Sequence, residues 1–282
     1  MIKKYIGLLF ELIKIKISLP VAFLGFIGFS LFRKETSWEA LLLAFGVLIL
    51  AGAASACNQV MEVAYDLKME RTRRRPIPSE QISIVQAIAI VVILAACGLY
   101  ILQSFNHVAF IVGMVTFIWY IGVYTMLKRV SAFAVIPGSL TGALPPMIGW
   151  AAAGGSIYDT PIIYIALFIF IWQIPHFWLL TLLYSKDYKK ANFPSLADYF
   201  NDNQIRKWTF VWIIFGLLFS AMSLLWFHSI YYRMIHLLLI AGVGYLSYSY
   251  LLLKPSLRNY KKLFHIINSL MVLLLLLQML FV

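Results

Sequence analysis

The chain has 282 residues, of which 62% are hydrophobic and 12% charged, and its mean hydropathy is +0.88. Soluble globular domains are about half apolar and about a quarter charged, so this composition excludes a water-soluble domain and indicates a polytopic membrane protein. The net charge of +12 would suggest nucleic acid as a partner in a soluble chain. Membrane topology accounts for most of it here, so we expect no nucleic-acid binding and one integral-membrane domain over residues 1–282.

Runs without Asp, Glu, Lys or Arg mark the membrane spans. The run 81–127 is long enough for two helices of about 20 residues each, with a break at the polar segment 104–107. The first run, 17–32, is short, and Lys14 and Lys16 would snorkel from its end. The eight runs are 17–32, 40–61, 81–127, 130–158, 160–185, 208–232, 234–253 and 263–282. They predict nine helices.

The basic residues orient these helices. With a cytoplasmic N-terminus, all of the 23 Lys and Arg residues except Arg33, Lys34 and Arg233 lie on the inner side, as the positive-inside rule requires. We therefore predict an all-α polytopic fold with nine transmembrane helices around a central cavity and the C-terminus outside. The larger inward connections, about 62–80 and about 185–207, place function on the cytoplasmic side. No Arg/Ser-rich transit segment precedes the first span, which favours a bacterial cell (inner) membrane.

Three oxygen-bearing side chains follow the second predicted helix at a spacing of four residues: Asn58, Glu62 and Asp66. A continuing helix would place them on one face. They lie at a helix C-terminus, where the macrodipole disfavours carboxylates, so they need a positive partner. Mg²⁺ prefers oxygen ligands and commonly binds one or two carboxylates together with substrate phosphates. The pattern fits a Mg²⁺ site, and it fits equally well an arrangement in which both acids pair with Lys68 and the arginines that follow.

Basic residues accompany these acids. Arg71 and Arg75 follow in the same loop, and guanidinium groups match phosphate oxygens bidentately, so a diphosphate could bind here. Lys128 and Arg129 carry the charge of a later inward connection, beside the hydroxyl of Tyr124. Positive-inside topology or contact with anionic lipid would also explain these cations without catalysis.

The sixth predicted span contains His176, and Asp187 follows at its cytoplasmic end. A histidine within the membrane is a candidate functional residue, although a hydrogen-bonded structural histidine facing the bundle fits nearly as well. His176 lies about two and a half turns from the charged end of the helix, which places it in the cavity wall. Asp187 could be a second metal ligand or could pair with the neighbouring lysines.

Several motifs between residues 58 and 196 occur in an order typical of one family. They are Asn58-x-x-x-Glu62-x-x-x-Asp66, Lys68-Met69-Glu70-Arg71-Thr72, Arg75-Pro76, Tyr124-Thr125, Leu127-Lys128-Arg129, Gly142-Ala143-x-Pro145-Pro146-x-Ile148-Gly149-Trp150, Pro175-His176-Phe177-Trp178, and Asp187-Tyr188 with Pro194. Together they resemble the UbiA-type intramembrane prenyltransferases, in the branch that farnesylates haem. Two departures are Glu62, where the family usually has Asp, and a second acidic motif reduced to Asp187.

The resemblance implies Mg²⁺-dependent transfer of a farnesyl group from farnesyl diphosphate to a vinyl group of haem B, giving haem O. It implies that His176 belongs to the haem pocket. The catalytic and metal-binding residues would be Asn58, Glu62, Asp66 and Asp187. The diphosphate would be bound by Lys68, Arg71, Arg75, Tyr124, Lys128 and Arg129. The implied surroundings are the lipid bilayer and, as protein partners, haem A synthase or terminal-oxidase assembly proteins.

Two other functions remain open from the sequence. A related prenyltransferase acting on a quinone precursor or another aromatic or lipid acceptor would share the metal and diphosphate site and differ in the cavity around His176. A transporter or a non-enzymatic assembly factor could also have nine spans with positive inner loops. It would not need Asn58, Glu62 and Asp66 on one face beside Arg71 and Arg75.

Overall fold

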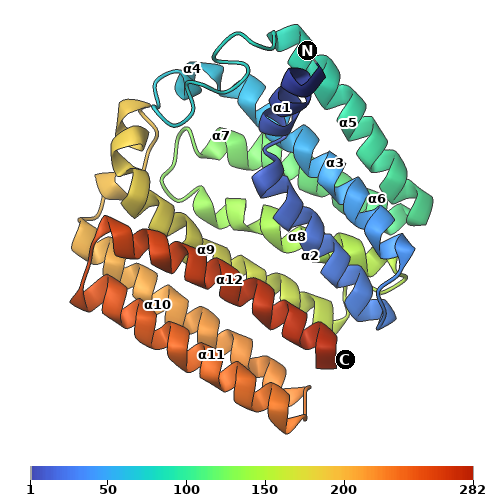
Figure 1. Cartoon of the computed structure of the whole chain (residues 1–282), viewed down its shortest axis with the longest axis vertical. Coiled ribbons are helices and arrows are strands. Elements are labelled where there is room, and N and C mark those ends of the chain that lie inside the picture. The colour runs from blue at the N-terminus through green and yellow to red at the C-terminus, as the bar shows by residue number, and fades with distance from the viewer. Residues whose placement is uncertain (1, 282) are drawn as a thin grey trace.

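The structure is a computed structural model that describes residues 2–281, and every regular element in this range is helical (Figure 1). Short π-helical or 3₁₀ turns, labelled η, continue or connect the α-helices. The elements are α1 Ile2–Leu12, α2 Ile15–Arg33, α3 Trp38–Met61, α4 Val63–Asp66, α5 Ile84–Phe105, α6 His107–Ile118, η1 Trp119–Tyr124, α7 Thr125–Leu127, α8 Val135–Ala152, α9 Thr160–Lys190, η2 Leu196–Asp198, α10 Asp202–Ser220, η3 Ala221–Leu225, α11 Ile230–Tyr248, η4 Ser249–Leu253 and α12 Leu257–Phe281.

Within residues 2–281, eight helical segments are long and apolar enough to cross a membrane, which makes the chain an integral membrane protein. They correspond to all the predicted spans except the one in the run 130–158. That run forms α8, a helix made less apolar by Pro145, Pro146 and several small or hydroxyl-bearing residues. The all-α class is confirmed. The count of nine transmembrane helices and the orientation of the two termini stay predictions.

The break predicted inside the run 81–127 is confirmed, and its cause is local capping. Helix α5 ends at Phe105, and the side chain of Asn106 accepts a hydrogen bond from the backbone N–H of Ala109 at 2.9 Å. Asn106 is therefore the N-cap of α6, and its side chain satisfies an N–H group that has no partner inside the helix. A second bond, from Asn106 Nδ2 to the carbonyl of Ala151 at 2.7 Å, ties this turn to α8.

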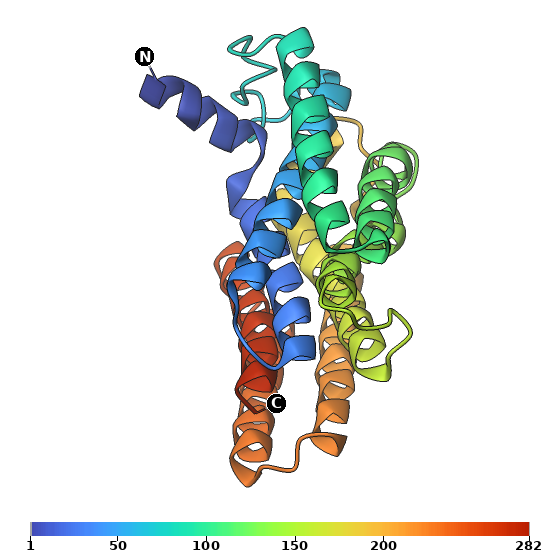
Figure 2. The same cartoon turned by 90° about the vertical axis from the view of Figure 1, so that its right-hand side faces the viewer.

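The beginning of the chain differs from the sequence-based expectation. Residues before the first span form a helix of their own, α1, which leans away from the other helices in Figure 2. The junction with α2 is Lys14, whose backbone is left-handed with φ 48° and ψ 54°. Non-glycine residues rarely adopt this conformation, so Lys14 marks a fixed and strained turn.

The helices form two packed groups. One contains α2, α3, α5, α6 and α8, the other contains α9 to α12, and α2 and α8 pack against the second group through α12 and α9. The connections after α3, α7, α9 and α11 lie at the same end of the molecule (Figure 1). These are the connections that the sequence predicts to be cytoplasmic, so the fold gathers their polar residues at one end.

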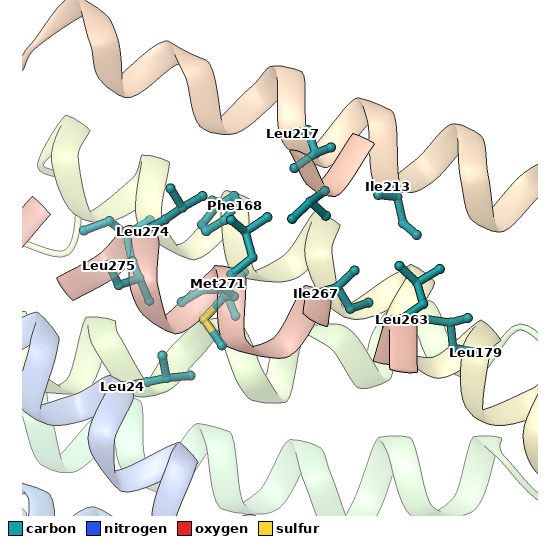
Figure 3. Close-up of a cluster of buried hydrophobic side chains, with 14 of the residues drawn as sticks. Leu24, Phe168, Leu179, Ile213, Leu217, Leu263, Ile267, Met271, Leu274 and Leu275 are labelled. Carbon is teal, nitrogen blue, oxygen red and sulfur yellow. The ribbon is translucent and has the colours of Figure 1, made fainter. Parts of the chain in front are cut away.

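The largest core cluster lies where the two groups meet. Figure 3 shows Met271 of α12 between Leu24 of α2 and Phe168 of α9, with Ile267 and Leu274 to either side along the same helix. Large apolar side chains are instead exposed on outer faces of α5 and α11, among them Val85, Val92, Tyr100, Leu238 and Tyr245. Apolar surface on outward helix faces is what a lipid environment requires, since lipid solvates side chains but not backbone polar groups.

Glycines let α2 and α8 approach closely. A Cβ atom on Gly149 would overlap the carbonyl oxygen of Gly25, and a Cβ on Gly28 would overlap the backbone of Pro146. Small residues at helix interfaces permit such backbone contact, and packing at this distance is a main source of helix association in membranes. The contact holds α8 beside α2 and so fixes one wall of the bundle.

We predict that Gly149→Ala destabilises the protein by about 1–3 kcal/mol, because backbone rather than a flexible side chain blocks the added methyl group. The measurement is thermal unfolding of the purified protein in detergent. Gly242→Ala on α11 is the matched control, since nothing lies within 4 Å of the added Cβ there. Equal melting temperatures for the two variants would contradict the close α2–α8 contact.

Candidate active site

Three side chains predicted to bind a metal define a surface that we call the acidic face: Asn58, Glu62 and Asp66. The prediction that one continuous helix carries all three side chains is wrong. Helix α3 ends at Met61 and α4 begins at Val63, and Glu62 between them has a φ of −110°. Helix-like bonds nevertheless continue through the break, from Glu62 N to Asn58 O at 3.1 Å and from Asp66 N to Glu62 O at 2.8 Å. All three side chains are buried.

Both acids are paired with cations from other segments. Lys128 Nζ lies 2.7 Å from Glu62 Oε2 and 2.6 Å from Oε1. Arg75 donates from Nη1 to both oxygens of Asp66, at 2.9 and 2.8 Å. The side chains of Glu62 and Asp66 are 3% and 1% exposed, respectively. Solvent therefore screens these two ion pairs less than it screens pairs at the surface. The alternative left open by the sequence, that both acids pair with basic residues of the loop that follows, is found for Asp66 with Arg75. Glu62 pairs instead with Lys128, which comes from another segment.

The third member of the acidic face is held by a residue that sequence reasoning assigned to membrane anchoring. Lys14 Nζ donates to Asn58 Oδ1 at 2.7 Å, and Asn58 Nδ2 donates to Thr125 Oγ1 at 3.3 Å. Burial, followed by the positive charges of Arg75 and Lys128, lowers the pKa of Lys14 to about 7. Lys14 thus contacts the acidic face and does not lie at the lipid interface.

Aromatic rings surround the cations of the site. Lys128 Nζ lies 5.6 Å from the ring centre of Tyr124 and 5.5 Å from that of Phe193. Arg129 donates from Nη2 to the carbonyl of Met61 at 2.7 Å, and its guanidinium lies 5.5 Å from the ring centre of Tyr65. Rings at these distances attract cations electrostatically. Phe193 of the loop after α9 therefore lies beside Lys128 at the acidic face, and it stacks on Tyr65 of α4.

The remaining predicted site residues lie farther from the acidic face or make no polar contact with it. The guanidinium of Arg71 lies 4.8 Å from the ring centre of Tyr184, and Lys68 is exposed. Asp187 is half-buried, and within residues 2–281 its side chain makes no hydrogen bond or ion pair. The structure thus brings Asn58, Glu62 and Asp66 together with Arg75 and Lys128. A role for Asp187 stays a prediction.

His176 lies deeper in the bundle. Its Nδ1 is 2.8 Å from Oδ1 of Asn268 on α12, and the ring of Phe264 stands 4.7 Å away. Phe177 connects this region to the site, since its ring centre is 5.5 Å from His176 and 6.1 Å from Tyr124. Sequence reasoning missed Asn268. The available signal was an amide side chain inside a predicted span, which is costly in lipid unless it has a partner.

The residues of the acidic face fit a hard divalent cation. Among residues 2–281 no three His, Cys, Asp or Glu side chains gather as a metal site would require. Glu62 and Asp66 nevertheless offer two carboxylates, and Asn58 offers an amide oxygen. Glu62 Oε1 is buried, and the ammonium of Lys128 at 2.6 Å does not meet hydrogen-bond geometry toward it. Mg²⁺ commonly binds one or two carboxylates and completes its shell with water and phosphate oxygens, so this donor set suits it.

Fold and site define an all-α integral membrane protein with a buried, cation-paired acidic face at one end of its helices. A match to the UbiA prenyltransferase family covers residues 18–270, so the chain belongs to that family. The fold agrees with solved structures. A structure of digeranylgeranylglyceryl phosphate synthase superposes with a TM-score of 0.78 at 17% identity, over 99% of this chain and 98% of that one.

A second similar structure is that of a UbiA homologue from Archaeoglobus fulgidus bound to GPP and Mg²⁺. Its TM-score is 0.72 at 16% identity, over 96% of this chain and 98% of that one. At such identities the likeness shows the fold alone.

Curated relatives are more similar in sequence. A protoheme IX farnesyltransferase from Geobacter sulfurreducens is 44% identical over 159 residues, which are 56% of this chain and 58% of that protein. One from Teredinibacter turnerae is 32% identical over 243 residues, which are 84% of this chain and 77% of that protein. The matched region thus spans less than two thirds of the Geobacter relative.

We predict that Asp66→Asn accelerates trypsin cleavage after the exposed Arg73 and Arg74. Removing the charge of Asp66 leaves Arg75 without its buried partner, and such a loss costs about 3 kcal/mol. Because proteolysis follows the population of the open loop, cleavage should speed up at least about tenfold. The measurement is a digestion time course in detergent.

Glu70→Gln is the matched control for this digestion. It removes the Glu70–Lys190 pair of 2.6 Å, whose side chains are 65% and 55% exposed, so the cleavage rate should not change. Equal rates for both variants would show that the Asp66–Arg75 pair does not hold the loop.

Proposed function

We propose that this protein transfers the farnesyl group of farnesyl diphosphate to a vinyl group of haem B, giving haem O. The bond between C1 of the farnesyl chain and the diphosphate oxygen breaks, and diphosphate leaves with the electron pair. The vinyl group then supplies the electrons for the new C–C bond. Water adds to the resulting cation and loses a proton, which leaves the hydroxyl group of the product.

One observation carries this proposal: two buried carboxylates, Glu62 and Asp66, lie beside Arg75 and Lys128 at the end of an apolar helical bundle. Isolated charges are expensive within a membrane protein, and their presence marks a functional site. Relatives that carry the name protoheme IX farnesyltransferase, one of them matched over 84% of this chain, support haem as the acceptor. The GPP and Mg²⁺ bound by the Archaeoglobus homologue support the diphosphate chemistry.

The site residues act on the leaving group. Asn58, Glu62 and Asp66 would hold Mg²⁺, with Asp187 as a further ligand, and the ion would neutralise charge on the departing diphosphate. Cationic side chains placed beforehand stabilise the same charge as it develops. The side chains proposed to bind the diphosphate in this way are Lys68, Arg71, Arg75, Tyr124, Lys128 and Arg129.

The rest of the bundle protects the allylic cation. Phe177 and Tyr124 line the path from Lys128 toward His176 with aromatic rings, which exclude water that would otherwise quench the cation early. A farnesyl chain contributes on the order of 10 kcal/mol to membrane partitioning, at about 0.8 kcal/mol per buried CH₂ group. Both substrates would therefore reach the site from the bilayer.

His176 is the proposed haem-pocket residue. With Asn268 Oδ1 as acceptor, Nδ1 of His176 carries the proton, and Nε2 is left as a free base that can bind the haem iron. Histidines that bind metals usually donate their other N–H to an oxygen in this way. The substrate would be held by its iron, with its vinyl edge turned toward the acidic face.

The proposal also places the reaction. The active site would open on the cytoplasmic side of a bacterial inner membrane, where the connections after α3, α7 and α9 gather. Haem O would pass to haem A synthase or to terminal-oxidase assembly proteins as partners.

We predict that cells lacking their own haem farnesylation make haem O when they express this chain, and that a Glu62→Ala, Asp66→Ala double variant makes none detectably. Loss of the carboxylates of Glu62 and Asp66 removes two of the proposed metal ligands of the acidic face, which should lower the rate by more than about a hundredfold. The measurement is haem extraction followed by mass analysis. Glu70→Ala is the control, because Glu70 is exposed and pairs only with Lys190 at the surface.

The acceptor is tested separately from the chemistry. If folded, well-expressed protein yields only haem B, the haem assignment is wrong. Turnover of labelled prenyl diphosphates with quinone precursors or other aromatic acceptors would then identify a related prenyltransferase. No turnover with any acceptor, together with unchanged function of the double variant, would indicate a transporter or an assembly factor.

We predict that Asn268→Leu weakens haem B binding by about ten- to a hundredfold, because the variant no longer fixes the ring of His176. His176→Ala should abolish the shift of the haem absorption band that marks iron coordination by nitrogen. His265→Ala on α12 is the control, since this histidine is exposed and the hydrogen bond to Asn268 comes from His176. An unchanged spectrum in His176→Ala would exclude iron binding by this residue.

A further inference from the structure

Each oxygen ligand of the acidic face is held by a cation from a different part of the chain. We call Lys14, Arg75 and Lys128 the three cations. Lys14 comes from the α1–α2 junction, Arg75 from the loop after α4, and Lys128 from the end of α7. Their contacts with the acidic face are all between 2.6 and 2.9 Å. The acidic face therefore has one cation for each of its three side chains.

Lys14 is built into this arrangement by its backbone. Its φ of 48° bends the chain between α1 and α2, and the bend directs its ammonium group to Asn58. Strained backbone persists only where surrounding structure determines it, and it is enriched at functional sites. Lys16, two residues later, is exposed and has no hydrogen bond or ion pair within residues 2–281. The two lysines of one short sequence motif thus have different surroundings.

The pairing creates a conflict for either ligand alone. A divalent cation that approaches the acidic face must displace Lys14 from the amide oxygen of Asn58 and must leave Arg75 and Lys128 without their carboxylate partners. A diphosphate that binds alone must draw Lys128 from Glu62 and Arg75 from Asp66, which leaves two buried carboxylates unpaired. Lys14 is bound to a neutral amide, so it can turn to the diphosphate without leaving an anion behind. Breaking one side of a buried ion pair is strongly unfavourable. When both ligands arrive together, the metal takes the carboxylates, the diphosphate takes the cations, and no buried charge is left alone.

We propose that Lys14 is a diphosphate-binding residue, and that Lys14, Arg75 and Lys128 exchange the acidic face for diphosphate oxygens when metal and diphosphate bind together. This inference rests on the proposed function of the site as a metal–diphosphate site. It adds a residue outside the UbiA-like motifs of the sequence. It also makes the two ligands depend on each other: each should raise the affinity for the other, and the three cations should oppose binding of the metal alone.

The test is equilibrium dialysis of the full chain in lipid nanodiscs against ⁵⁴Mn²⁺ and ³²P-labelled inorganic diphosphate, separately and together, with empty nanodiscs as background. Wild-type protein should bind each ligand at least about tenfold more tightly in the presence of the other. Because Mn²⁺ and diphosphate also associate in water, the comparison between variants decides the result.

Lys14→Met should change the two affinities in opposite directions. Mn²⁺ alone should bind about fivefold more tightly than to wild type, since one competing cation is gone, while diphosphate in the presence of Mn²⁺ should bind at least about fivefold more weakly. Lys14→Arg should restore diphosphate binding, and Lys16→Met should match wild type. Melting temperatures of all variants identify any that fail to fold. If Lys14→Met fails to fold, the ligand affinities of Lys14→Arg are compared with those of wild type and Lys16→Met instead.

Each result has a defined meaning. If Lys14→Met binds both ligands as Lys16→Met does, or if it loses affinity for both ligands equally, the exchange is wrong while the proposed function stands. If wild-type protein binds neither ligand, singly or together, the metal–diphosphate function fails and the exchange fails with it.

Discussion

The burial of Glu62 and Asp66 at the end of an apolar bundle is the constraint on which the rest of the structure depends. Two carboxylates in such a place must be matched by positive charge, and Lys128 and Arg75 supply it at 2.6 to 2.9 Å. Because these partners come from separate segments, the pairs join the loop after α4 to the end of α7. Electrostatics thus orders this end of the molecule, together with the buried apolar cluster of Met69, Ala191 and Phe193.

The helices position this charged end and surround it with an apolar exterior. Backbone contact between α2 and α8, permitted by Gly28 and Gly149, places two walls of the bundle side by side. The α12 side chains in Figure 3 fill the space between α2, α9 and α10. Outer faces of α5 and α11 present apolar side chains. A polar site inside an apolar surface suits the proposed reaction between a prenyl diphosphate and a hydrophobic acceptor.

The sequence predicts eight of the long apolar helices and the grouping of the three side chains of the acidic face, because both are encoded locally. Uncharged runs indicate helices that contact lipid. The spacing of Asn58, Glu62 and Asp66 indicates that they share one helix face, even though the helix is interrupted at Glu62. The partners are not predictable in this way. Nothing local distinguishes Lys14 from Lys16, since only the turn after α1 directs one of them inward. The pairing of His176 with Asn268 likewise depends on the packing of α9 against α12.

The most direct test of this account is an experimental structure of the protein with Mn²⁺ and a non-hydrolysable farnesyl diphosphate analogue, with the metal located by its anomalous signal. The account predicts metal at a coordination distance of about 2.0–2.2 Å from carboxylate oxygens of Glu62 and Asp66, with Lys128 and Arg75 turned to the diphosphate. Metal bound elsewhere, or carboxylates still paired with their present partners beside a bound diphosphate, would contradict it.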